Sequence, residues 1–149
     1  MMLEKGEKAP EFEGIDQDGN TIKSSDFSDK KIVLYFYPKD NTPGCTAQAC
    51  NLRDNYQSLL AQGYVVIGVS QDSTASHKKF IEKQNLPFPL IADTDHVVHN
   101  LFGVWGEKKM YGKTYMGTLR TTFIIDEQGI IEEVIAKVKT KDHTAQILV

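Results

Sequence analysis

Two apolar runs constrain the fold of this chain more than any other feature of the sequence. Residues 32–37 (IVLYFY) and 64–70 (YVVIGVS) are rich in β-branched and aromatic side chains and show almost no polar alternation. Strands of this kind are buried on both faces, as they are at the centre of a sheet covered by helices on either side. Neither run approaches the roughly 20 apolar residues that a membrane-spanning helix needs.

The segments around these strands carry helical and strand patterns. Residues 42–62 place apolar side chains at three- and four-residue intervals, which predicts one helix, and residues 73–85 predict a second. Residues 88–93 (FPLIAD) predict a third strand, which should lie toward a sheet edge because prolines stand near its start. Residues 95–103 predict a short helix, and residues 141–149 begin a last one.

Turn residues predict hairpins near both ends of the chain. Residues 14–27 contain an Asp-Gly-Asn turn and residues 121–135 a Glu-Gln-Gly turn. The polar, Gly-rich residues 103–117 are expected to form a long loop. This order predicts an α/β protein with a thioredoxin-like fold, in which helices flank a central mixed β-sheet that follows an N-terminal β-hairpin. We expect one domain over residues 1–149.

The composition narrows the classes of function. The formal net charge is −3 and there is no basic block, which argues against nucleic acid or an anionic membrane as a partner. The N-terminus lacks the apolar segment of a signal peptide, so we expect a cytoplasmic protein whose thiols are kept reduced. In that compartment the only two cysteines, Cys45 and Cys50, are expected to be catalytic or metal-binding.

Both cysteines follow the point where a predicted central strand leads into a helix. Thr42 suits the N-cap and Pro43 the first helical position, so Cys45 would lie in the first turn, beside unpaired backbone N–H groups. Lowering a cysteine pKa from about 8.5 to about 6 needs about 3.4 kcal/mol. A helix dipole supplies at most about 2 kcal/mol. We therefore expect a nearby cation, and Arg120, which precedes a predicted strand, is a candidate.

The segment YPKDNTPGCTAQAC (residues 37–50) resembles the active site of peroxiredoxins, with Pro38, Thr42 and Cys45 in the pattern P-x-x-x-T-x-x-C. A second cysteine five positions later is typical of the bacterioferritin-comigratory, or peroxiredoxin Q, group. The resemblance continues through R-x-x-F-x-I-D, which begins at Arg120. It implies a thiol peroxidase that reduces hydrogen peroxide and organic hydroperoxides and is re-reduced by thioredoxin or a similar dithiol. We expect this enzyme to act as a monomer and to need no cofactor.

The resemblance also implies a role for each matched residue. Cys45 would be the peroxidatic thiolate, and Cys50 the resolving cysteine that condenses with the sulfenic acid of Cys45. Thr42 would hydrogen-bond the peroxide and the sulfur, and Pro38 would shield the pocket. Arg120 would hold the thiolate and polarise the peroxide.

Simpler interpretations stay open for several of these residues. Cys50 could be only a small apolar helix residue, and Pro38 only the end of a strand. Arg120 taken alone would be an ordinary surface cation. Relatives usually carry Glu where this chain has Gln48, which leaves open any role of that carboxylate here.

Two other classes of function could use a close pair of cysteines. A thioredoxin-like disulfide reductase normally uses C-x-x-C, and this chain has none. A metal-binding or interaction module would need more ligands than one C-x₄-C pair and a histidine provide. His96 and His99 share a helix face but are too few for a metal. Asp93 and Asp95 are expected to be strand-end and helix-cap residues rather than a catalytic carboxylate pair.

The five-residue spacing carries a prediction of its own. In one regular helix the Cα atoms of Cys45 and Cys50 would lie about 8.6 Å apart, with side chains about 140° away from each other. A disulfide needs Cα atoms within about 7 Å. The sequence therefore predicts that residues 42–52 must unwind before a disulfide forms.

Overall fold

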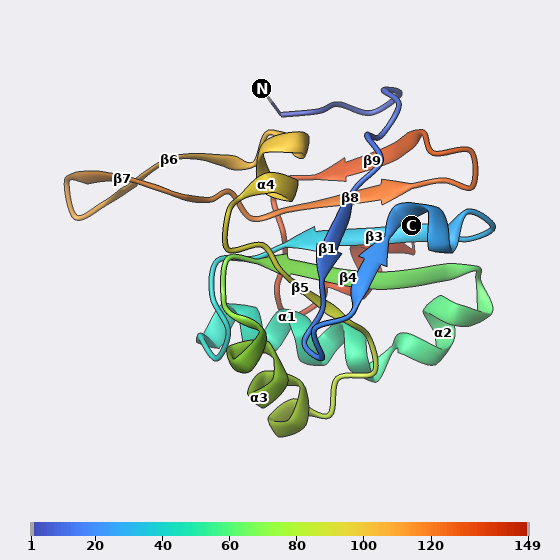
Figure 1. Ribbon diagram of the computed structural model, residues 1–149, viewed down its shortest axis with the longest axis horizontal. Coiled ribbons are helices and arrows are strands. Elements are labelled where there is room, and N and C mark those ends of the chain that lie inside the picture. Colours follow the sequence, from blue (N-terminus) through green and yellow to red (C-terminus); the bar gives the residue numbers. More distant parts are fainter. Residues whose placement is uncertain (1, 149) are drawn as a thin grey trace.

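The computed structural model describes residues 2–148 and places them around one mixed five-stranded sheet (Figure 1). At its centre, β3 (Lys31–Phe36) runs parallel to β4 (Tyr64–Ser70) on one side and antiparallel to β8 (Thr121–Ile125) on the other. Beyond them, β5 (Leu90–Ala92) and β9 (Ile131–Ile135) form the edges. The thioredoxin-like α/β architecture and the edge position of β5 are thus confirmed.

Helices cover one face of the sheet and enclose the first core. They are α1 (Pro43–Asp54), α2 (Tyr56–Ala61), α3 (Thr74–Gln84) and α5 (His143–Ile147). Val33 and Tyr35 of β3 point into this core, where Cys45 and Leu52 of α1 pack against them. The nucleophile candidate is therefore built into a hydrophobic core rather than onto a surface loop.

The opposite face carries a second core under different elements. The N-terminal hairpin of β1 (Glu13–Ile15) and β2 (Thr21–Lys23), the 3₁₀ helix η1 (Ser24–Phe27) and α4 (Val97–Phe102) lie there. Leu34 and Phe36, which alternate with Val33 and Tyr35, point into this core. Burial on both faces explains why the central strands lack polar alternation. No helix within residues 2–148 is long and apolar enough to cross a membrane.

The prediction of a single helix over residues 42–62 is wrong, because the structure divides this segment into two helices at Asn55. This residue adopts φ −111° and ψ 12°, between the end of α1 and the start of α2. Its Nδ2 donates to the carbonyl oxygen of Asn51 at 2.8 Å. A side chain that bonds the preceding turn competes with the backbone ladder and favours such a bend.

The prediction of a long loop over residues 103–117 is also wrong. The structure forms a hairpin there, from β6 (Trp105–Met110) and β7 (Lys113–Thr118), which projects away from the sheet (Figure 1). Tyr111 and Gly112 make the two-residue turn with φ of 53° and 76°, the positive values that such turns require. The sequence signal was weak because the lysine-rich strands bury no continuous apolar face.

Candidate active site

The start of α1 forms as the sequence predicts. Thr42 is the N-cap residue, with φ −84° and ψ 153°, and Pro43 occupies the first helical position. Cys45 lies in the first turn with only 1% of its surface exposed. The Thr42 hydroxyl does not cap the helix through its side chain but donates to the carbonyl oxygen of Lys39 at 2.8 Å. Its oxygen keeps lone pairs that can accept a further hydrogen bond.

Arg120 reaches Cys45 because of how the sheet pairs. Thr121 of β8 lies opposite Phe36, the last residue of β3, so the chain just before β8 lies beside the entry to α1. Arg120 Nη2 donates to Cys45 Sγ at 3.2 Å. An added Cβ on Gly44 would lie 3.4 Å from Arg120 Nη2, so the guanidinium lies directly against the first turn of α1. The cation expected beside Cys45 is present.

The same guanidinium also contacts Gln48, one turn after Cys45. Arg120 Nη1 donates to Gln48 Oε1 at 2.7 Å, and the Gln48 side chain is fully buried. The two terminal nitrogens of Arg120 are thus divided between a sulfur and an amide oxygen. This divided fork fixes the plane of the guanidinium against α1.

Lys108 of the β6–β7 hairpin is a second cation near the site, which the sequence did not point to. Burial lowers the pKa of Lys108 and the charge of Arg120 lowers it further, while Cys45 acts in the opposite direction. The stem of Lys108 packs on Gly117, where an added Cβ would meet it at 3.0 Å. No sequence signal could single out Lys108, because only the folded hairpin brings it here.

Cys50 lies on α1, so both cysteines share one helix as expected. Both are free thiols, and Cys50 is half-buried. Its Sγ lies 3.4 Å from Gln84 Oε1 at the end of α3, on the other side from Arg120. Pro38 follows β3 and begins the loop that leads to Thr42. These positions are compatible with the roles expected for Cys50 and Pro38.

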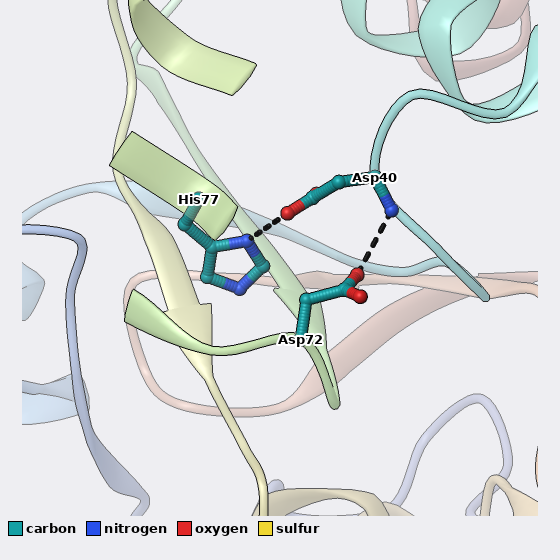
Figure 2. A group of neighbouring side chains, drawn as sticks. All are labelled: Asp40, Asp72 and His77. Atoms are coloured by element: carbon teal, nitrogen blue, oxygen red, sulfur yellow. Dashed lines mark hydrogen bonds and ion pairs between the residues drawn. The ribbon is translucent and has the colours of Figure 1, made fainter. Parts of the chain in front are cut away.

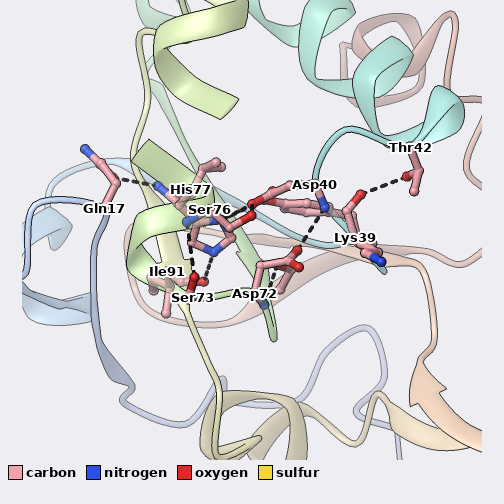
Figure 3. A network of polar contacts seen from close by, with 12 residues as sticks. Gln17, Lys39, Asp40, Thr42, Asp72, Ser73, Ser76, His77 and Ile91 are labelled. Atoms are coloured by element: carbon pink, nitrogen blue, oxygen red, sulfur yellow. Dashed lines mark hydrogen bonds and ion pairs between the residues drawn. The ribbon is translucent and has the colours of Figure 1, made fainter. Parts of the chain in front are cut away.

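A buried polar network, which no sequence pattern predicted, anchors that loop to α3 (Figure 3). Asp40 accepts hydrogen bonds from the Tyr37 hydroxyl at 2.6 Å and the Ser76 hydroxyl at 2.8 Å. His77 Nδ1 lies 2.7 Å from Asp40 Oδ2, and His77 Nε2 lies 2.9 Å from the carbonyl oxygen of Ile91. A carbonyl only accepts, so Nε2 carries a proton. One proton must also lie between His77 Nδ1 and Asp40 Oδ2, because two acceptors would repel each other at 2.7 Å.

Asp40, Asp72 and His77 have the residue types of a metal site, but protein groups occupy their polar atoms (Figure 2). Asp72 Oδ2 accepts from the Asp40 backbone N–H at 2.8 Å and from the Ser70 hydroxyl at 2.7 Å. Both nitrogens of His77 are engaged. We therefore assign the group to anchoring the loop between Pro38 and Thr42.

Asp40→Asn is expected to lower the free energy of unfolding by about 3 kcal/mol, because one of the two carboxylate oxygens that accept from buried partners becomes an NH₂ donor and leaves those partners unsatisfied. Urea denaturation measures this loss. Asp18→Asn is the matched control, since Asp18 is exposed and its ion pair with Lys78 spans 3.9 Å. Exposed pairs contribute less than about 1 kcal/mol. Equal stability of the two variants would contradict the anchoring role.

His99 and Asp93 form a second buried pair, at the start of α4. Asp93 accepts hydrogen bonds from the backbone N–H groups of Val98 and His99 and lies 2.6 Å from His99 Nδ1. Burial raises the pKa of Asp93, but the bonds from His99 and Val98 outweigh it and lower the pKa overall. Asp93 thus lies directly after β5 and binds the first turn of α4 from there, whereas the N-cap position itself is held by His96. The ring of His96 stacks on the ring of Trp105, with 3.7 Å between the two ring centroids.

Comparisons with known proteins agree with this geometry. The model of the AhpC/TSA family matches residues 5–134. Peroxiredoxin Bcp of Bacillus subtilis is 51% identical over 99% of this chain and 94% of its own length. Peroxiredoxin Bcp of Escherichia coli is 47% identical over 98% of this chain and 94% of its own length.

Solved structures give the same result. A PrxQ mutant of Xylella fastidiosa superposes with a TM-score of 0.91 at 32% identity, over 99% of this chain and 94% of that one. Peroxidoxin BcpB of Mycobacterium tuberculosis superposes with a TM-score of 0.87 at 33% identity, over 98% of this chain and 94% of that one. The chain therefore belongs to the AhpC/TSA family, in its Bcp, or peroxiredoxin Q, group of peroxiredoxins.

Proposed function

We propose that this protein reduces hydrogen peroxide and organic hydroperoxides with Cys45 as the nucleophile, and that Cys50 resolves the product. Its family is one of thiol-dependent peroxidases. The observation that carries the assignment of Cys45 is the hydrogen bond from Arg120 Nη2 to its buried sulfur at the start of α1. The helix N-terminus and the guanidinium both favour the thiolate, which is the reactive form.

In the first step the Cys45 thiolate attacks one oxygen of the peroxide. The O–O bond breaks, Cys45 becomes a sulfenic acid, and the other oxygen takes up a proton and leaves as water or an alcohol. Arg120 and the free backbone N–H groups of the first turn stabilise the charge that develops on the oxygens. Thr42 accepts a hydrogen bond from the peroxide, and Pro38 shields the pocket from water.

In the second step the Cys50 thiol condenses with the sulfenic acid, which releases water and forms a disulfide. Thioredoxin or a similar dithiol then reduces this disulfide. Both cysteines belong to one helix of one chain, so resolution requires no second subunit. We accordingly propose a monomeric, single-domain enzyme over residues 1–149 that works in the cytoplasm, where dithiol reductants are maintained.

The resolving step requires α1 to unwind, because an intact helix holds the two Cα atoms about 8.6 Å apart. Unwinding must break the contacts of Asn51, the residue after Cys50, with the C-terminal segment. Asn51 Nδ2 donates to the carbonyl oxygen of Lys141 at 3.1 Å, and Asn51 Oδ1 accepts from the Thr144 N–H at 2.8 Å. The disulfide form should therefore also loosen the packing of α5.

Hydrogen exchange tests this unwinding. Oxidation is expected to speed exchange of the amides of residues 45–52 by at least about tenfold, because local opening exposes them to solvent. The amides of β4 serve as the internal control, since this strand is hydrogen-bonded to β3 and β5 rather than to α1. Equal protection in both redox states, with the disulfide confirmed by mass, would show that the helix need not unwind.

Peroxide consumption coupled to thioredoxin tests the function itself. We expect turnover of hydrogen peroxide and of a neutral organic hydroperoxide, and no reduction of insulin disulfides. The alternative, a thioredoxin-like disulfide reductase, requires the opposite result. The five-residue spacing disfavours it, because reductases of that kind use a C-x-x-C pair.

A further inference from the structure

Gln48 makes an unusual partner for a half-buried arginine. Arginine normally pairs with a carboxylate through two charge-assisted hydrogen bonds. Here Arg120 donates to the neutral Gln48 Oε1 at 2.7 Å. Gln48 Nε2 is buried and has no hydrogen-bond partner within residues 2–148. An unpaired buried donor is costly, so its presence needs a reason.

The charged groups around Cys45 are cationic, and a neutral amide at position 48 leaves that positive charge intact. Within residues 2–148, Arg120 makes no ion pair with a carboxylate. Lys108 of β6 adds a second cation, whose pKa reflects both Arg120 and Cys45. Tyr35 of β3 stays protonated because burial raises its pKa, and burial lowers the pKa of His143 of α5. The environment of the sulfur is therefore positive.

The remaining titratable groups do not change this sign. Cys50 lies further along α1, against Gln84. Asp40 influences Tyr35, but its carboxylate is bound to His77 and Ser76. Among residues 2–148, a carboxylate at position 48 would be the one acidic group in direct contact with Arg120. It would offset the guanidinium charge and repel a thiolate held on the same fork.

We propose that Gln48 is a positioning residue that fixes the Arg120 guanidinium against Cys45 and, being neutral, leaves its positive charge available to the thiolate. The proposal rests on the proposed function, because it concerns the nucleophile of that reaction. The amide oxygen of Gln48 holds the guanidinium in place. Because Gln48 carries no charge, the positive charge of the guanidinium is left to favour the thiolate form of Cys45. These two properties are separable by substitution, since Glu keeps the acceptor and adds a charge, whereas Met removes the acceptor and adds none.

The test is a thiolate titration by ultraviolet absorbance on full-length protein in a Cys50→Ser background, where Cys45 is the only thiol. Gln48→Glu is expected to shift the midpoint upward by at least about one pH unit, a tenfold change in the ionisation equilibrium. Gln57→Glu is the matched control, because it adds the same charge on the exposed side of α2. It should leave the midpoint within a few tenths of a unit.

The pH profile of the first step separates the two properties. The sole tryptophan, Trp105, provides a fluorescence signal for a single turnover with hydrogen peroxide. The rate of Gln48→Glu should approach the parent rate as the pH rises above its midpoint, because Arg120 is still anchored. The rate of Gln48→Met should stay at least about tenfold low at every pH, because Arg120 has lost its anchor.

An unchanged midpoint in Gln48→Glu, or an equal midpoint shift in Gln57→Glu, would overturn the proposal. A parent-like rate in Gln48→Met would also overturn it, by showing that Arg120 needs no anchor. The titration involves no peroxide, so its failure leaves the peroxidase function standing. Failure of the peroxidase assay would leave the titration result intact.

Discussion

Replacing Cys45 by Ser is expected to lower peroxide turnover by at least about a thousandfold while the fold is retained. A hydroxyl is not ionised near neutral pH, so the variant lacks the nucleophile whatever its surroundings provide. Ser is close to Cys in size and keeps a group that can accept from Arg120 Nη2, so the packing of α1 should survive. Thioredoxin-coupled peroxide consumption and circular dichroism measure the two parts of this prediction.

Cys50→Ser is the matched control for Cys45→Ser. It keeps the nucleophile and loses only the resolving thiol, so it should complete one turnover and stop as a sulfenic acid. Mass spectrometry after trapping with a sulfenic acid reagent detects this state. Full turnover by Cys45→Ser, or a sulfenic acid on Cys50 in place of Cys45, would reverse the assignment of the two cysteines.

Replacing Arg120 by Ala is expected to slow the first step by about a hundredfold. The variant loses the donor to Cys45 Sγ and the fixed charge that favours the thiolate, while the helix dipole supplies at most about half of the required shift. The midpoint of the Cys45 thiolate titration should therefore rise by at least about one pH unit. Stopped-flow kinetics and ultraviolet titration in the Cys50→Ser background measure the two effects.

Arg53→Ala is the control for Arg120→Ala, because Arg53 is the only other arginine in the chain. It lies at the end of α1, where it donates to the carbonyl oxygen of Gln84 and pairs with Asp54. Its loss should change the first-step rate by less than about twofold. If both arginine variants titrate alike, the guanidinium of Arg120 is not what stabilises the thiolate.

The layered fold and the start of the site follow from patterns in the amino-acid sequence. The unbroken apolar runs of residues 32–37 and 64–70 required two covered faces, because a sheet with one wet face shows polar alternation. Thr42 and Pro43 set the helix start and thereby put Cys45 in the first turn. These features were predictable because they depend on neighbours within a few residues along the chain.

Tertiary structure alone decided what surrounds Cys45. Sheet register brings Arg120 to a sulfur 75 positions away, and the network that fixes the loop joins Asp40 to His77 across 37 positions. The hairpin that carries Lys108 has no apolar period, so the sequence pattern does not predict its pairing. The structure shows the two strands joined by a turn at Tyr111 and Gly112. Contacts of this range depend on how whole elements pack, and no local propensity or spacing encodes them.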